Sequence, residues 1–150
     1  MKEFQIKTTT FSSIQLLNEN EELVGELLFN LVAGFKEKIK IKEEIFKIKN
    51  TGFLWNDIKV FDENEKLMIE SDISKGRFIY FGDSKEIYTY KYRCWFSNKA
   101  NLFRNEELVI SINMKGFFKT KYEIKVANYL TNYLMVLTFL NSYIRNSSSA

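Results

Sequence analysis

The sequence contains no histidine and no proline, and among its 150 residues it has one cysteine, Cys94, and six glycines. Without histidine, a Ser-His or Cys-His nucleophile cannot form, and the most common transition-metal ligand is missing. One cysteine allows neither an intramolecular disulfide nor a cysteine-rich zinc site. The glycines are scattered singly, so there is no glycine-rich phosphate loop. The most common types of enzyme and metal site are therefore excluded.

Paired carboxylates are the remaining source of catalysis, but they occur in short polar segments that we interpret as solvated turns. Glu21 and Glu22 lie in one such segment, and Glu43 and Glu44 lie in another. Cys94 stands beside Trp95 in an apolar stretch, which indicates packing rather than a nucleophile. We therefore predict a non-enzymatic protein with no cofactor and no bound metal.

The composition is that of an ordinary folded domain. Hydrophobic residues make up 45% of the chain and aromatic residues 16%. The absence of any Pro-rich or Gly/Ser-rich linker predicts one domain over residues 1–145, followed by a loose tail at 146–150. The opening MKEFQIKTTTF has no apolar segment typical of a secretory signal, so we expect a cytoplasmic location. The abundance of Lys, Ile and Asn suggests an A/T-rich bacterial genome.

Up to about residue 124, apolar and polar residues alternate with period two, which is typical of β-strands. Short clusters of Asn, Asp, Glu and Gly separate the alternating segments. The predicted strands are Phe4–Lys7, Ser13–Leu17, Leu23–Phe29, Lys36–Lys42, Ile45–Lys49, Trp55–Phe61, Lys66–Ser71, Arg77–Phe81, Glu86–Tyr92, Cys94–Ser97, Leu108–Met114 and Lys119–Ile124.

Two of the predicted hairpins are similar in sequence. IQLLNENEELVGE, from Ile14, aligns without gaps with IKVFDENEKLMIE, from Ile58. A looser third version is WFSNKANLF, with Asn98 and Asn101 in the turn. The repetition is compatible with a tandem ligand site, but we interpret it as one hairpin design used repeatedly in a meander.

The stretch VANYLTNYLMVLTFLNSYI, residues 126–144, carries no charge. At helical spacing its apolar side covers most of the circumference, which is typical of a helix buried in a protein core or in lipid. Asn128, Asn132 and Asn141 argue against lipid, because an amide in hydrocarbon is costly without a partner. We predict a core helix over 126–144 with no transmembrane span; a tail anchor or an exposed docking helix are the alternatives.

About a dozen strands ending in such a helix suggest a closed antiparallel barrel that surrounds it, because closure removes free strand edges and buries the helix. The repeated hairpins around LLNENEELVGEL and VFDENEKLMIES, the segment KIKIKEEIFKIKNTGFLWNDIKVFD and the terminal helix resemble the tubby C-terminal-like superfamily, which includes the tubby, phospholipid scramblase and LURP-one-related families. The turns here lack the glycine that often follows Asp or Asn in those families.

The resemblance implies a twelve-stranded barrel around a central hydrophobic helix and no shared catalytic activity. Some members of these families bind phosphoinositides or other membrane lipids. None of their headgroup-binding residues can be matched to a position in this sequence.

The most informative polar segment is KEKIKIK. Alternate residues of a strand share a face, so its lysines form a basic ladder about 20 Å long, opposite Ile39 and Ile41. A tight turn at Glu43-Glu44 would extend the ladder onto the next strand. The resulting candidate site for anionic lipid headgroups comprises Lys36, Lys38, Lys40, Lys42, Lys47 and Lys49. A solvated exterior or a lysine-protected edge is the simpler interpretation of the same pattern.

A second candidate surface lies in IYTYKYRCWF, where Tyr88, Tyr90 and Tyr92 share one strand face. Exposed, this row would suit a protein-interaction module, such as a neutralising partner or an assembly subunit. Aromatic residues interleaved with Lys and Arg can also stack on single-stranded nucleic acid, the least favoured interpretation. The sequence thus predicts a binding module for anionic membrane surfaces, peripheral at the membrane, with a protein partner as the alternative.

Overall fold

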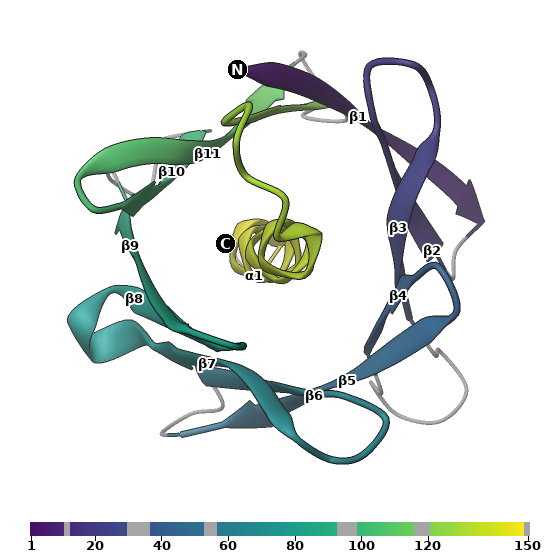
Figure 1. Cartoon of the computed structure of the whole chain (residues 1–150). Helices are drawn as coiled ribbons and strands as arrows, with labels where there is room; N and C mark the ends of the chain where they lie inside the picture. The colour runs from purple at the N-terminus through teal and green to yellow at the C-terminus, as the bar shows by residue number, and fades with distance from the viewer. Residues whose placement is uncertain (11–12, 30–36, 53–56, 93–98, 116–120, 149–150) are drawn as a thin grey trace.

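The computed structural model describes residues 1–10, 13–29, 37–52, 57–92, 99–115 and 121–148. Within these residues twelve antiparallel strands close into a barrel, and one α-helix occupies its centre (Figure 1). Each strand pairs with its neighbours along the chain, and β1 closes the ring against β12. The predicted fold class, a closed barrel of about twelve strands around a buried helix, is therefore confirmed.

The strands follow one another as an up-and-down meander. Their bounds are β1 Lys2–Thr10, β2 Ser13–Leu17, β3 Leu23–Leu28, β4 Lys38–Ile41, β5 Glu44–Thr51, β6 Asp57–Phe61, β7 Leu67–Asp72, β8 Arg77–Phe81, β9 Lys85–Tyr92, β10 Lys99–Arg104, β11 Glu107–Lys115 and β12 Lys121–Val126. A 3₁₀ turn, Ile73–Lys75, joins β7 to β8. The predicted strand Cys94–Ser97 lies entirely outside the described residues. The strand β10 was not predicted.

The helix α1, Tyr133–Ser148, begins seven residues later than predicted. Val126 is still a strand residue, paired with both Lys2 and Ile110. The side chain of Asn132 then accepts a hydrogen bond from the Met135 amide at 3.1 Å, as a helix N-cap does. The helix also continues to Ser148, so residues 146–148 are not the loose tail that the sequence suggested.

The core consists of the inner face of the barrel and nearly every side of the helix. Leu134 to Leu140 are all buried, including Thr138, whose hydroxyl donates to the Leu134 carbonyl oxygen at 2.7 Å. Asn141, 1% exposed, donates from Nδ2 to Glu37 Oε2 at 3.1 Å. The protein interior thus supplies the polar partner that lipid would lack.

Gly25 marks the place where the helix presses against the barrel wall. A Cβ atom at this position would lie 2.6 Å from Leu137 Cδ1 and 3.0 Å from the Lys40 carbonyl oxygen. Both distances are shorter than normal van der Waals contacts, so a larger side chain would overlap with the helix. Gly25 is therefore a position of close approach between the barrel wall and the helix.

Three hairpins, β2–β3, β6–β7 and β10–β11, share one construction. In each, two apolar residues pair on the outer face next to the turn, and a bulge then restores the inward alternation. The outer pairs are Leu17 with Leu23, Phe61 with Leu67, and Phe103 with Leu108. The third copy is therefore LFRNEELVI, which turns at Asn105 and Glu106, and not WFSNKANLF.

The turns of the first two hairpins have the same hydrogen bonds. Asn18 Oδ1 accepts from the amides of Asn20 and Glu22, each at 2.9 Å. Asp62 Oδ1 accepts from the amides two and four residues later in the same way. Glu21 and Glu65 occupy the same left-handed position, both with φ 61°. These side chains serve the turn itself, which supports a repeated hairpin design over a tandem ligand site.

Candidate functional site

The outer surface of β4, β5 and β6 carries a row of lysines, because these strands alternate strictly. Ile39 and Val60 are fully buried, and Phe46 and Ile48 are 6% and 7% exposed. The residues between them must point away from the helix, since successive side chains of a strand lie on opposite faces. The lysines that point outward are Lys38, Lys40, Lys47, Lys49 and Lys59.

The strand register places lysines directly opposite one another. Lys38 pairs with Lys47 across β4 and β5, and Lys49 pairs with Lys59 across β5 and β6. Like charges in directly opposed positions destabilise a sheet. None of the ion pairs found among the described residues involves any of these four lysines. Their charges are therefore available to an external anion.

An aromatic ring lies among these charges. Phe61 is the cross-strand neighbour of Lys47, and Lys49 Nζ lies 5.1 Å from the centroid of its ring. We call the outward-pointing set Lys38, Lys40, Lys47, Lys49, Lys59 and Phe61 the basic face. Carboxylates border it, because Glu26 is opposite Lys40 and Glu70 is opposite Lys59, and Glu63 lies against the Ile45 amide on β5.

The basic face differs in membership from the predicted ladder. Lys36 lies outside the described residues. Lys42 is exposed and forms the β4–β5 turn with Glu43, at φ 54°, so the turn comes one residue earlier than predicted. Lys59 and Phe61 were missed, although the alternation in DIKVF places both on the face opposite Ile58 and Val60.

Two members of the predicted tyrosine row, Tyr88 and Tyr90, pack into the core of the barrel. Tyr88 is 0% exposed, and Tyr90 packs on Phe78 with ring centroids 5.4 Å apart. The side chain of Tyr92 lies outside the part of the chain that the structure describes. The prediction of an exposed tyrosine surface is therefore wrong at Tyr88, because the opposite face of β9 holds Lys85, which stays in water.

Tyr88 contributes instead to a polar cluster with Glu86 and Arg104, near the β8–β9 and β10–β11 turns. Its hydroxyl donates to Glu86 Oε2 at 2.8 Å, and Arg104 Nη1 lies 3.7 Å from Glu86 Oε1. Burial, followed by the bond to the Glu86 carboxylate, raises the pKa of Tyr88 well above its usual range. The phenol therefore stays neutral, which suits a structural contact rather than acid–base chemistry.

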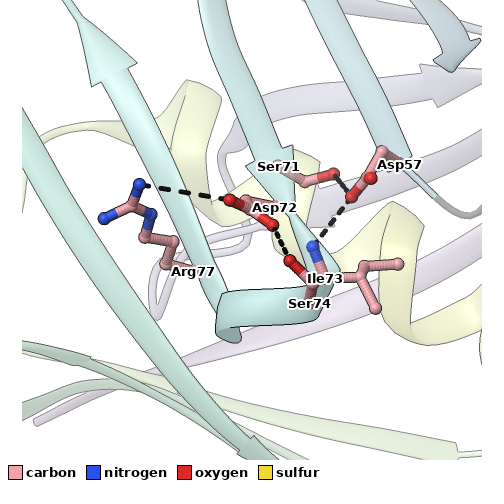
Figure 2. Close-up of polar contacts among 6 residues, drawn as sticks. All are labelled: Asp57, Ser71, Asp72, Ile73, Ser74 and Arg77. Atoms are coloured by element: carbon pink, nitrogen blue, oxygen red, sulfur yellow. Dashed lines mark hydrogen bonds and ion pairs between the residues drawn. The ribbon is translucent and has the colours of Figure 1, made fainter. Parts of the chain in front are cut away.

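A second polar cluster fixes the corner between β7 and β8 (Figure 2). Asp57 Oδ1 accepts from the Ser71 hydroxyl at 3.1 Å and from the Ile73 amide at 2.8 Å. Asp72 accepts from the Ser74 hydroxyl at 2.6 Å, and this bond lowers the pKa of Asp72. The carboxylates are committed to backbone and hydroxyl donors, so the cluster shapes the corner.

A third cluster ties the end of the helix to the wall. Glu37 accepts from Asn141, its Oε1 lies 3.9 Å from Arg145 Nε, and Arg145 donates to Asn50 Oδ1. Among the described residues, no group of three or more His, Cys, Asp or Glu side chains could hold a metal ion. Cys94 lies outside the description.

The comparisons with protein-family models, curated proteins and solved structures gave no match. Within the residues that the structure describes, no helix has the length and apolarity needed to cross a membrane.

Proposed function

We propose that the protein is a non-enzymatic module that binds anionic membrane surfaces through the basic face. The observation that carries the proposal is the register of β4, β5 and β6, which opposes Lys38 to Lys47 and Lys49 to Lys59. An arrangement that costs stability in the free protein would be relieved by a surface of many negative charges.

The expected affinity is modest. A lysine near an anionic bilayer contributes about 1 kcal/mol, so five give about 5 kcal/mol, which corresponds to a dissociation constant in the range of about 0.1 to 1 mM before any apolar contact. Salt screens such attraction over about 10 Å at 0.1 M ionic strength. Binding should therefore be reversible and strongly dependent on salt.

The charges of the hairpin turns support side-on binding. The five turns at one end of the barrel, 18–22, 42–43, 62–66, 82–84 and 105–106, contain nine acidic and two basic residues. An anionic bilayer would repel this end of the barrel. Binding through the wall keeps these turns away from the lipid and places the basic face against it.

We also propose a distant relationship to the tubby C-terminal-like superfamily. It is supported by a closed barrel around one helix, the architecture that the resemblance implies. The rival protein-interaction surface loses support because Tyr88 is buried. A peripheral location on the cytoplasmic side of a membrane follows from the same proposal.

The test is sedimentation of the full chain with phosphatidylcholine vesicles, with and without phosphatidylserine, over a range of salt concentrations. The proposal expects pelleting only with phosphatidylserine and release by salt. Absence of binding at every salt concentration would overturn it. Recovery of one stoichiometric protein partner in a pull-down, while vesicles recover nothing, would favour the rival.

A further inference from the structure

The basic face contains more than charge, because an apolar pair lies beside its lysines. Phe61 pairs with Leu67 across β6 and β7 on the outside of the barrel, and both side chains are partly exposed. On the other side of Phe61, the same row continues through Lys47 to Lys38. The row Lys38–Lys47–Phe61–Leu67 crosses four strands and spans about 14 Å at the spacing of neighbouring strands.

One lysine of the basic face lies over the Phe61 ring. Lys49 places its ammonium group over the Phe61 ring, where the cation is attracted by the π-electrons. Lysine stems are flexible and can lie along apolar surface while the ammonium group reaches outward. When anionic headgroups approach, the ammonium group of Lys49 can turn toward a phosphate and leave the ring uncovered.

From this arrangement we infer that Phe61 and Leu67 insert into the interfacial region of the bilayer once the lysines have drawn the protein to it. The inference rests on the proposed function and adds a lipid-specific step to it. A charged face with an adjacent apolar group is the pattern by which peripheral proteins hold a bilayer. The convex outer wall of a barrel also spreads the ammonium groups apart, which suits an extended surface better than one small anion.

The acidic groups nearest the ring keep their negative charge, and backbone amides hold their carboxylates in place. Asp62 Oδ1 accepts from the amides of Asn64 and Lys66. Glu63 Oε1 accepts from the Ile45 amide at 3.2 Å, across on β5. These bonds hold the Asp62 carboxylate at the turn and the Glu63 carboxylate against β5.

The chain supplies a matched control for the test. Leu17 occupies in β2–β3 the position that Phe61 occupies in β6–β7, next to the same turn and the same bulge. Its cross-strand neighbour on β1 is Gln5 rather than a lysine. Both side chains are partly exposed, so Phe61→Ser and Leu17→Ser each remove an outer apolar side chain from one of two equivalent hairpins.

The experiment compares vesicle binding of the wild type, Phe61→Ser, Phe61→Leu and Leu17→Ser, with thermal unfolding as the check on folding. Phe61→Ser should bind phosphatidylserine vesicles about tenfold more weakly, because a buried phenyl group is lost from the complex. Its salt dependence should match the wild type, because no charge has changed. Phe61→Leu should recover much of the affinity, and Leu17→Ser should bind like the wild type.

A second arm uses inorganic polyphosphate, which offers negative charge without an apolar phase. Wild type and Phe61→Ser should bind polyphosphate equally. If the wild type binds vesicles and Phe61→Ser binds them with the same affinity, insertion is overturned and the proposed function stands. Equal losses for Phe61→Ser and Leu17→Ser would also overturn it. If the wild type binds no vesicles, the proposed function itself fails.

Discussion

The hairpins β2–β3 and β6–β7 are built alike and differ in what surrounds them. Their turns have the same hydrogen bonds, the same left-handed glutamate and the same bulge. The outer apolar pair of β6–β7 stands beside Lys47, whereas that of β2–β3 stands beside Gln5. The turn is thus a common structural device, and the difference in surface chemistry comes from the neighbouring strands.

The inner faces of the two hairpins also differ. Gly25 in β3 occupies the position of Ile69 in β7 and Ile110 in β11, both of which are fully buried. The glycine is required on the side where Leu137 of the helix comes closest to the wall. An isoleucine at position 25, as at the equivalent positions of β7 and β11, would leave no room for Leu137.

The largest expected effect is a loss of stability, and it should differ between the inner faces of β3 and β7. Gly25→Val should destabilise the protein by about 3 kcal/mol, because the new side chain overlaps Leu137 and the Lys40 backbone. Ile69→Val, at the equivalent position, should cost about 1 kcal/mol through loss of one methylene group. Urea unfolding measures both. Equal stability of Gly25→Val and the wild type would show that the helix is not held against β3.

The turns should respond alike if the two hairpins are equivalent. Asn18→Ala and Asp62→Ala each remove the acceptor of two amide hydrogen bonds, which should cost about 1 kcal/mol per hairpin. Asn18→Asp and Asp62→Asn should be tolerated, because either side chain offers the same acceptor. Thermal unfolding of the four variants tests this, and a large difference between the alanine variants would show that the turns are not equivalent.

A charge reversal on the outer face should raise the stability of the free protein and weaken its binding to vesicles. Lys47→Glu replaces the Lys38–Lys47 repulsion with an attraction, which should raise the stability of the free protein by about 0.5 kcal/mol. The same change should weaken binding to phosphatidylserine vesicles. The comparison needs Lys7→Glu in β1 as a control, which should leave vesicle binding nearly unchanged. Reduced stability of Lys47→Glu would show that the pairing of Lys38 with Lys47 does not destabilise the free protein.

The smallest effect concerns the corner that follows β7. The Ser74 hydroxyl holds the pKa of Asp72 below its ordinary value of 3.8. A lowered carboxyl pKa contributes stability that is present above the ordinary value and is lost as the pH falls through the lowered one. Ser74→Ala should therefore shift the titration of Asp72 to higher pH in an NMR titration. Ser84→Ala, in the β8–β9 turn, should leave it unchanged.

Period-two alternation was sufficient to predict eleven of the strands, because inward positions are apolar and outward positions polar. The strand β10 was missed because Asn101 is an outward-facing residue in the middle of a strand, where asparagine usually indicates a turn. The start of the helix was missed for a related reason. Val126 faces the barrel interior from β12, and Leu130 is buried in the segment that joins β12 to α1. Hydrophobicity alone does not separate these roles from a helix.

The candidate site was predictable in part. The alternation in KIKIKEEIFKIK placed Lys38, Lys40, Lys47 and Lys49 on one face without any tertiary information. Lys59 and Phe61 joined them only through the β5–β6 register, which a single sequence does not specify. Alternation divides the residues of β9 between two faces, but it does not show that the face of Tyr88 is the buried one.

The central claim is that the position of the lysines, and not the net charge of the chain, directs the protein to an anionic bilayer. The most direct measurement compares two triple variants of equal charge in vesicle sedimentation: Lys47, Lys49 and Lys59 changed to Glu, and the exposed Lys7, Lys75 and Lys85 changed to Glu. The first variant should lose binding to phosphatidylserine vesicles while the second retains most of it. Equal loss in both would show that net charge, and not the position of the lysines, determines binding.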